Sequence, residues 1–122
     1  MELNFIEKND VKIAELVSEN TVINNVQDAL DLIGNCDYNY ARKIIVNKEH
    51  IHENFYDLKT KLAGEILQKF TNYRMELAII GDFSNYTSKS LRDFIYECNK
   101  NKKFCFLKSR EEAIDVLAGK NI

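Results

Sequence analysis

The chain has 122 residues, 45% of them hydrophobic and 30% charged, which is enough for one domain with a real hydrophobic core. Its net charge is −2 and its pI is near 5.7, so it lacks the basic field that favours nucleic-acid backbones. No apolar stretch approaches the ~20 residues of a membrane span, and the start MELNFIEKND is not typical of a signal peptide. We therefore expect a cytoplasmic protein without nucleic-acid or membrane partners.

The first predicted elements are two strands. ELNFIEK (2–8) and VKIAELV (11–17) flank Asn9-Asp10, a pattern that indicates a β-hairpin. A helix should follow, capped by Asn24 or Asn25. Its apolar positions recur at i, i+3, i+4 and i+7, and they are Val26, Ala29, Leu30 and Ile33. We expect Gly34 to lie at the end of this helix, where a left-handed residue is favoured.

The middle of the chain predicts two buried strands separated by a helix. KIIV (43–46) and ELAII (76–80) are continuous apolar runs, typical of strands covered on both faces. The helix between them should be long, with an apolar stripe formed by Leu58, Leu62, Ile66 and Phe70. Gly64 lowers helix propensity, and close packing against the sheet is the expected reason.

The last third repeats the alternation of helix and strand. Leu91, Phe94, Ile95 and Cys98 form a further helical stripe. FCFL (104–107) should be the last strand, and Ser109 with Glu112 predicts a capping box for the last helix, which Gly119 ends.

The element order ββαβαβαβα predicts an α/β fold in a single domain, residues 1–122. Strands that alternate with helices favour a mostly parallel sheet with right-handed crossovers, and the N-terminal hairpin adds an antiparallel part. The three cysteines, Cys36, Cys98 and Cys105, are dispersed and should be reduced thiols. We expect Cys98 and Cys105 to behave as small core residues.

Function is expected at one edge of this sheet. Ligands of such folds gather beyond the carboxyl ends of the parallel strands, where three junctions should meet: residues 47–60, 81–89 and 108–109. The junction GDFSNYTSK (81–89) is rich in hydroxyl groups and could be a ligand loop, a phosphorylation site or a helix cap. Capping by Ser88 or Ser90 is the favoured interpretation, and the charge of Asp82 would oppose a bound phosphate.

A metal site or an enzyme is the alternative at this edge. His50 and His52 lie two residues apart, so in a strand both imidazoles would point the same way, as a metal site needs. Carboxylates for acid–base chemistry could come from Glu49, Glu53, Asp57 and Asp82, although Asp57 can equally be a helix cap. No cofactor-binding glycine motif is present, and we expect no cofactor.

Nearly the whole chain resembles one small bacterial family. The similarity rests on GEILQKF…LAIIGDF…TSKSLRDFIYE within residues 57–99, with VQDALDLI before it and SREEAIDVL after it. The family is domain of unknown function 4180, whose name implies no activity.

More distantly, the element order is similar to the STAS domain of anti-sigma-factor antagonists. In the stretch FYDLKTKLAGEIL, Asp57 matches the acidic residue of the STAS phosphorylation motif. The phosphoacceptor position falls on Leu58, which cannot be phosphorylated, and the second serine falls on Lys59, while Thr60 is displaced by two residues. The resemblance implies a STAS-like fold and a protein-binding surface without an intact phosphoacceptor motif.

The sequence thus predicts a non-catalytic binding or regulatory module for an unidentified protein partner, and a homo-oligomer is left open. The candidate partner-face residues are Asp57, Thr60, Lys61, Asp82, Ser84, Tyr86, Thr87 and Lys89. The alternative is a small metal- or ligand-dependent enzyme that uses the loops at 47–60 and 81–89.

Overall fold

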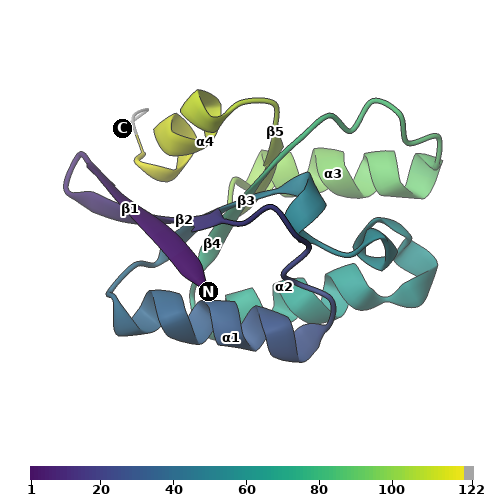
Figure 1. Ribbon diagram of the computed structural model, residues 1–122. Coiled ribbons are helices and arrows are strands. Elements are labelled where there is room, and N and C mark those ends of the chain that lie inside the picture. The colour runs from purple at the N-terminus through teal and green to yellow at the C-terminus, as the bar shows by residue number, and fades with distance from the viewer. Residues whose placement is uncertain (120–122) are drawn as a thin grey trace.

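The N-terminal hairpin forms as predicted in the computed structural model, which describes residues 1–119 (Figure 1). Strand β1 (Glu2–Lys8) pairs antiparallel with β2 (Val11–Val17) over its whole length. Asn9 and Asp10 join them with φ angles of 54° and 65°. Two positive φ angles define the type I′ turn, whose twist matches that of the strands it connects.

The predicted order ββαβαβαβα is confirmed, and the five strands form one mixed sheet in the order β1-β2-β3-β4-β5. The two continuous apolar runs become β3 (Lys43–Asn47) and β4 (Glu76–Ile80), and the last strand is β5 (Phe104–Leu107). Strands β2 to β5 are parallel to one another. Because these four strands run in the same direction, their carboxyl ends share one edge of the sheet.

Four α-helices cover the two faces of the sheet unequally. Right-handed crossovers between neighbouring strands place the connecting helices on one face. These are α1 (Val26–Tyr38), α2 (Leu62–Asn72) and α3 (Lys89–Asn101). Helix α4 (Arg110–Leu117) packs on the other face, opposite α1 and α2 in Figure 1. Within residues 1–119, no helix is long and apolar enough to cross a membrane.

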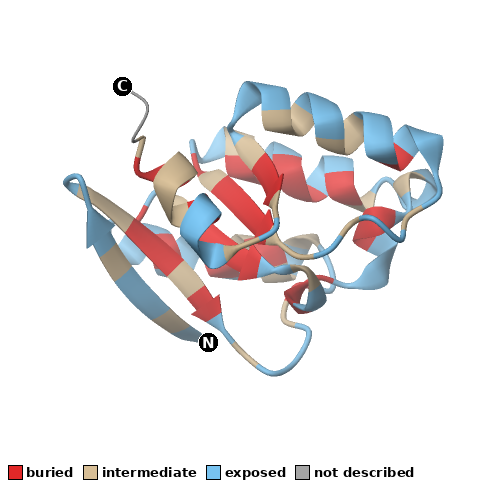
Figure 2. Ribbon diagram, turned by 90° about the horizontal axis from the view of Figure 1, so that it is seen from above, coloured by how far each residue is buried: buried red, intermediate tan, exposed pale blue. Residues whose placement is uncertain are grey.

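Strands β3 and β4 are buried on both faces, which explains their unbroken apolar runs. Ile44, Val46 and Ile79 belong to the larger core under α1 to α3. Ile45 and Ala78 face the smaller core under α4. Figure 2 shows this burial along the central strands, whereas β1 at the margin is mostly exposed.

Three local expectations about the helices are wrong. Helix α1 continues past Gly34 to Tyr38, so this glycine is an exposed interior position. Gly64 is also exposed, and a Cβ built on it would meet no atom within 4 Å, so packing against the sheet does not explain it. Helix α2 begins at Leu62 instead of including Leu58, because Lys61 adopts a left-handed conformation with φ 66°.

Side-chain caps fix the beginnings of the other helices. Asn25, Ser88 and Ser109 each accept a hydrogen bond from a backbone N–H in the first turn of α1, α3 and α4, at 2.8, 3.2 and 3.1 Å. The Glu112 carboxylate meets the Ser109 hydroxyl at 3.3 Å. Ser109 thus caps α4 as predicted, but the contact of Glu112 with the serine hydroxyl is not the bond to the Ser109 backbone N–H that defines a capping box. Gly119 follows α4 with φ 70°, as expected for a residue that ends a helix.

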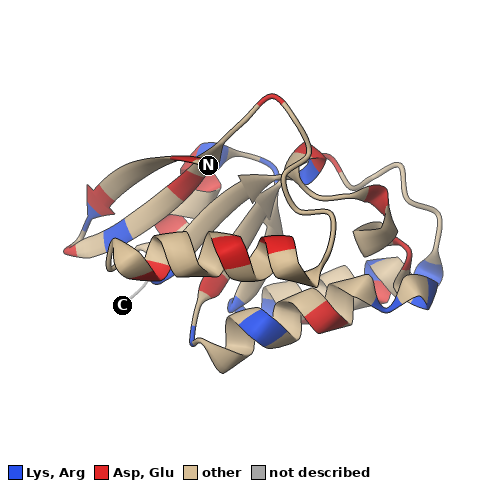
Figure 3. Ribbon diagram, turned by 60° about the horizontal axis from the view of Figure 1, so that its bottom comes forward, with Lys and Arg blue, Asp and Glu red and all other residues tan. Residues whose placement is uncertain are grey.

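Two ion pairs tie α4 to the N-terminal hairpin, on which Figure 3 shows charges of both signs. The Arg110 guanidinium donates to both carboxylate oxygens of Glu15, at 2.6 and 3.2 Å. Lys8 contacts Asp115 at 2.7 Å. Partial burial by itself would raise the pKa of Glu15, but the hydrogen bonds from Arg110 and Asn4 lower it overall. The carboxylate is thus held in its charged form.

Candidate functional site

The three predicted junctions meet at the carboxyl ends of the parallel strands. The Lys48 ammonium, just after β3, donates to the backbone oxygen of Asp82, just after β4, at 3.0 Å. Lys108, just after β5, lines a hollow together with residues 81–84. We therefore treat this edge as the candidate functional site.

The segment between β3 and α2 is built from three short 3-10 turns, Lys48–His50, Glu53–Tyr56 and Leu58–Thr60. Such turns leave many backbone groups without regular partners, so side chains must satisfy them. The side chains of His50, Asp57 and Thr60 are among those that do so.

His50 is buried, with 3% of its surface exposed, and both of its ring nitrogens bond to the backbone. Nδ1 accepts from the Asn47 N–H at 2.9 Å. Nε2 therefore carries the proton and donates to the Ser18 carbonyl at 3.0 Å. His52 is exposed, and its Nδ1 accepts from the Asn54 N–H at 3.0 Å.

The structure does not bring the two imidazoles together on one face. His50 points inward and His52 lies at the surface. The described residues 1–119 contain no group of three or more histidine, cysteine, aspartate or glutamate side chains placed to hold a metal ion. The chemical role of His50 is to link the end of β2 to the end of β3.

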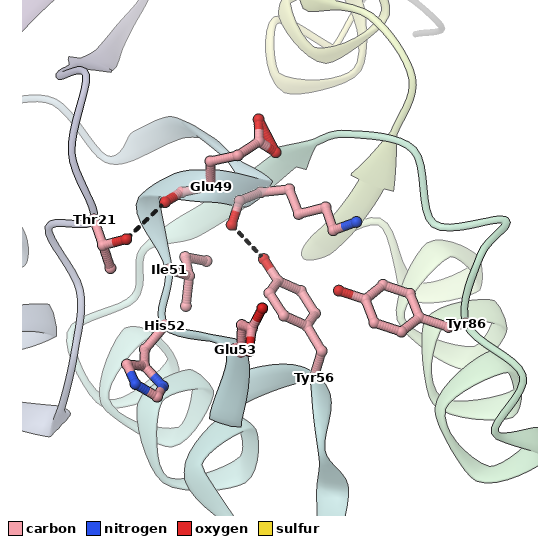
Figure 4. A pocket seen from close by; sticks show the side chains of 8 residues that line it. Thr21, Glu49, Ile51, His52, Glu53, Tyr56 and Tyr86 are labelled. Carbon is pink, nitrogen blue, oxygen red and sulfur yellow. Dashed lines mark hydrogen bonds between the residues drawn. The ribbon is translucent and has the colours of Figure 1, made fainter.

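A fourth segment, residues 18–25 after β2, also belongs to the site. The backbone N–H groups of Val22 and Ile23 donate to the His50 carbonyl at 2.8 Å each. The backbone N–H of His52 donates to the Ile23 carbonyl at 2.9 Å. The Thr21 hydroxyl donates to the Glu49 carbonyl at 3.2 Å (Figure 4). Sequence reasoning missed this segment, because backbone bonds between distant loops leave no side-chain pattern.

A chain of aromatic rings joins the loops to the core. Tyr56 stacks on Tyr86 with ring centroids 5.5 Å apart, and Figure 4 shows these two rings facing each other across the site. Phe83 contacts Tyr56, Tyr86 and Phe106 at 6.1, 6.4 and 5.3 Å. The buried Tyr56 hydroxyl donates to the Lys48 carbonyl at 3.0 Å, and burial raises its pKa. These contacts hold the loop 81–88 against the loop 47–61.

Lys48 lies between the aromatic rings and the start of the 81–88 loop. Its ammonium lies 4.7 Å from the centre of the Tyr86 ring and 5.8 Å from that of Phe83. A Cβ built on Gly81 would lie only 2.6 Å from the Lys48 Cβ. Gly81 is thus required for the close approach of Lys48 to the chain.

The hydroxyl-rich loop is ordered by its own polar groups. Asp82 Oδ1 accepts from the hydroxyl and the backbone N–H of Ser84, at 2.6 and 2.9 Å. These two bonds lower the pKa of the Asp82 carboxyl. Ser88 is the N-cap of α3, whereas Ser90 lies exposed within its first turn. The capping interpretation of this junction is confirmed for Ser88.

The other candidate residues lie on the surface of the same edge. Asp57 accepts from the Lys59 N–H at 3.2 Å and so caps a 3-10 turn. The Thr60 hydroxyl lies 2.6 and 2.8 Å from the carbonyls of Asn54 and Asp57, so the backbone already engages it. Lys61, Thr87 and Lys89 are exposed, and Tyr86 is half-buried.

Two of the larger hollows among the described residues flank the aromatic chain. One of about 550 Å³ is mainly polar, and Figure 4 shows the side chains around it. It is lined by Thr21, Lys48, Glu49, Ile51, His52, Glu53, Tyr56 and Tyr86. The other, of about 700 Å³, has an apolar floor formed by Phe83, Ile95, Phe106 and Leu107. Its polar rim contains Asp82, Ser84 and Lys108.

The three cysteines are free thiols. Cys36 and Cys105 are buried and Cys98 is half-buried, which agrees with the core role predicted for Cys98 and Cys105. Burial raises the pKa of Cys36 to about 12 and that of Cys98 to about 11. Both thiols are therefore protonated at neutral pH.

Residues 8–117 match the model of the family described as "Domain of unknown function (DUF4180)". The chain belongs to this family, as the motifs in its sequence predicted. Searches of curated proteins and of solved structures found no match.

Proposed function

We propose that this protein is a non-catalytic binding module in the cytoplasm, and that its carboxyl-edge loops receive a protein partner. The observation that carries the proposal is the hollow with the apolar floor. Protein interfaces centre on a buried apolar anchor surrounded by a polar rim. The floor of Phe83, Ile95 and Phe106, with Asp82, Ser84 and Lys108 around it, has this composition.

The construction of the loops supports the same proposal. Stacked rings, the Lys48 bond and the His50 bonds hold the segments in place before any partner arrives. Preorganised loops lose less conformational entropy on binding, so more of the contact energy contributes to affinity. The exposed candidates Thr87 and Lys89 lie next to this rigid surface and are expected to contact the partner.

The similarity to the STAS domain of anti-sigma-factor antagonists also supports a regulatory role through protein binding. The phosphoacceptor position of that family falls on Leu58, which is half-buried here. We propose that regulation, where it occurs, does not use phosphorylation at this position. Thr60, the nearest hydroxyl, is bonded to backbone carbonyls.

Affinity purification from the native cell tests the proposal with two adjacent variants on α3. Ile95→Glu places a carboxylate in the apolar floor, whereas Tyr96→Glu alters a side chain that is 65% exposed and does not line the hollow. We expect one protein to be captured by the wild type and by Tyr96→Glu but lost with Ile95→Glu. Lys89→Ala should weaken capture, and Lys100→Ala, at the far end of α3, should not.

Thermal melting of each variant is the control for folding. If Ile95→Glu and Tyr96→Glu capture the same proteins, the partner does not bind in this hollow. A large thermal shift of the wild type with divalent cations or nucleotides would instead favour the small-enzyme alternative, because specific ligands stabilise the native state.

A further inference from the structure

The two margins of the sheet are protected to very different degrees. At the β5 margin, the side-chain amide of Asn99 on α3 accepts from the N–H of Phe106 at 2.7 Å and donates to its carbonyl at 3.2 Å. A side chain therefore occupies the backbone N–H and C=O of Phe106, in the middle of this edge strand. At the other margin, β1 has β2 as its single neighbouring strand among residues 1–119. Figure 2 shows no helix beyond it.

The unpaired groups of β1 belong to alternate residues. Lys8 and Val11 flank the two-residue turn, and such a pair exchanges both of its backbone hydrogen bonds. Residues 2, 4, 6 and 8 therefore bond to β2. Residues 3, 5 and 7 direct their N–H and C=O groups outward, where they can bond to a further strand.

The two ends of β1 carry opposite charges, so they are complementary in the antiparallel direction. When Phe5 lies opposite Phe5 of a second copy, all seven residues of ELNFIEK find a partner. Glu2 then faces Lys8 of the other strand, and this contact occurs twice because the arrangement is symmetric. Phe5, 36% exposed, lies on the twofold axis with an outward-facing backbone, so this register also aligns the free hydrogen-bonding groups.

The neighbouring symmetric registers pair fewer residues and lose the contact between Glu2 and Lys8. Centring on Asn4 or Ile6 shortens the pairing to five residues. It also sets Glu2 opposite Ile6 or Lys8 opposite Asn4, so the opposite charges no longer meet. Charges on an edge strand normally discourage pairing with a foreign strand. In the Phe5-centred register the same charges attract, and they therefore select a second copy of this chain.

We infer that the protein forms a symmetric homodimer in which the two β1 strands pair antiparallel about Phe5, which joins both sheets into one of ten strands. This inference does not depend on the proposed function. The carboxyl-edge loops lie beyond the ends of β3 and β4, so the pairing of β1 leaves them free in both copies.

Charge exchange between the two strands tests this pairing. Glu2→Lys and Lys8→Glu each create two like-charge contacts, and each should weaken dimerisation by about tenfold in sedimentation equilibrium. The double variant restores opposite charges and should recover the wild-type affinity. Glu2 and Lys8 of one strand are ~20 Å apart, so the recovery must come from contacts between copies.

The ion pair of Lys8 with Asp115 is lost equally in the Lys8→Glu single variant and in the double variant. Its loss therefore cannot produce the recovery.

A Cys98→Ser background removes the half-buried native thiol from the cross-linking experiment below.

Cross-linking gives the register. Two Phe5→Cys residues on the twofold axis would have Cα atoms about 5.5 Å apart, within the range of disulfides. Two Glu7→Cys residues would be ~14 Å apart along the strands and should not cross-link. We expect mild oxidation to yield a species of twice 14.2 kDa with Phe5→Cys alone.

Three results would overturn the inference. The first is a wild-type protein that sediments as a monomer at the highest concentration at which it stays soluble. The second is a dimer whose affinity is the same in the wild type, in Glu2→Lys and in Lys8→Glu, since such a dimer uses another face. The third is equal cross-linking by Phe5→Cys and Glu7→Cys.

Discussion

The structure predicts that His50 stabilises the candidate site through two separable hydrogen bonds. Replacing it by alanine would leave the Asn47 N–H and the Ser18 carbonyl without partners. Both bonds are only partly buried, and a hydrogen bond of this kind contributes about 0.5–1.5 kcal/mol, so the loss of the two should lower the free energy of unfolding by about 1–3 kcal/mol in His50→Ala. A small domain has about 5–15 kcal/mol in total, so a loss of this size is measurable.

Two isosteric variants separate the bonds. An asparagine oxygen can occupy the place of Nδ1 and keep the bond from Asn47, while a glutamine amide can occupy the place of Nε2 and keep the bond to Ser18. We expect His50→Asn and His50→Gln each to cost about 0.5–1.5 kcal/mol, less than the alanine variant. Urea unfolding followed by circular dichroism measures these values. The slope of the free energy of unfolding against urea concentration should be the same in all three variants as in the wild type.

Hydrogen exchange identifies where the loss acts. The amides of Val22 and Ile23 bond to the His50 carbonyl and should lose protection in His50→Ala before those of the central strands do. A stabilising role of His50 is refuted if the free energy of unfolding of His50→Ala lies within about 0.5 kcal/mol of the wild-type value, as it does for most substitutions at exposed sites. The role of its hydrogen bonds is refuted if all three variants lose the same free energy, since side-chain shape and not hydrogen bonding would then decide stability.

Three further predictions concern single residues. Gly64→Ala should raise stability by about 1 kcal/mol in thermal melts, because the site is helical and open; a lower melting temperature would contradict this. Gly81→Ala should cost about 1–3 kcal/mol by urea unfolding, because the new Cβ would meet that of Lys48 at 2.6 Å. Glu15→Gln should be less stable than the wild type at neutral pH. Burial raises the folded-state pKa of Glu15, but the hydrogen bonds from Arg110 and Asn4 outweigh burial and lower this pKa overall. A lowered pKa contributes stability above its ordinary value of 4.5, and that contribution is lost as the pH falls, so the two unfolding curves should converge in acid.

Local sequence signals determined the elements of the fold. The alternating strands around Asn9-Asp10, the apolar runs of β3 and β4 and the cap at Ser88 all depend on a few neighbouring residues. The element order then limited the topology, because right-handed crossovers leave few arrangements. The expected meeting of the loops after β3, β4 and β5 followed from that order alone.

Local sequence signals gave wrong predictions where the same residues are compatible with more than one conformation. Glycine is common at helix ends, yet Gly34 and Gly64 lie inside helices whose packing outweighs the lower propensity. The apolar stripe also continued through Leu58, although the left-handed Lys61 separates that residue from α2. The sequence pattern specifies which residues are apolar, and the surrounding structure decides where the helix begins.

Only the tertiary structure decided the chemistry of the candidate site. His50 and His52 look alike in sequence, but the first bonds to the Ser18 carbonyl, 32 residues away, and the second lies in solvent. Gly81 is explained by Lys48, which follows a different strand. The stacking of Tyr56 on Tyr86 likewise joins two loops. These partners become neighbours only when parallel strands align their carboxyl ends, so no local pattern can encode the contacts between them.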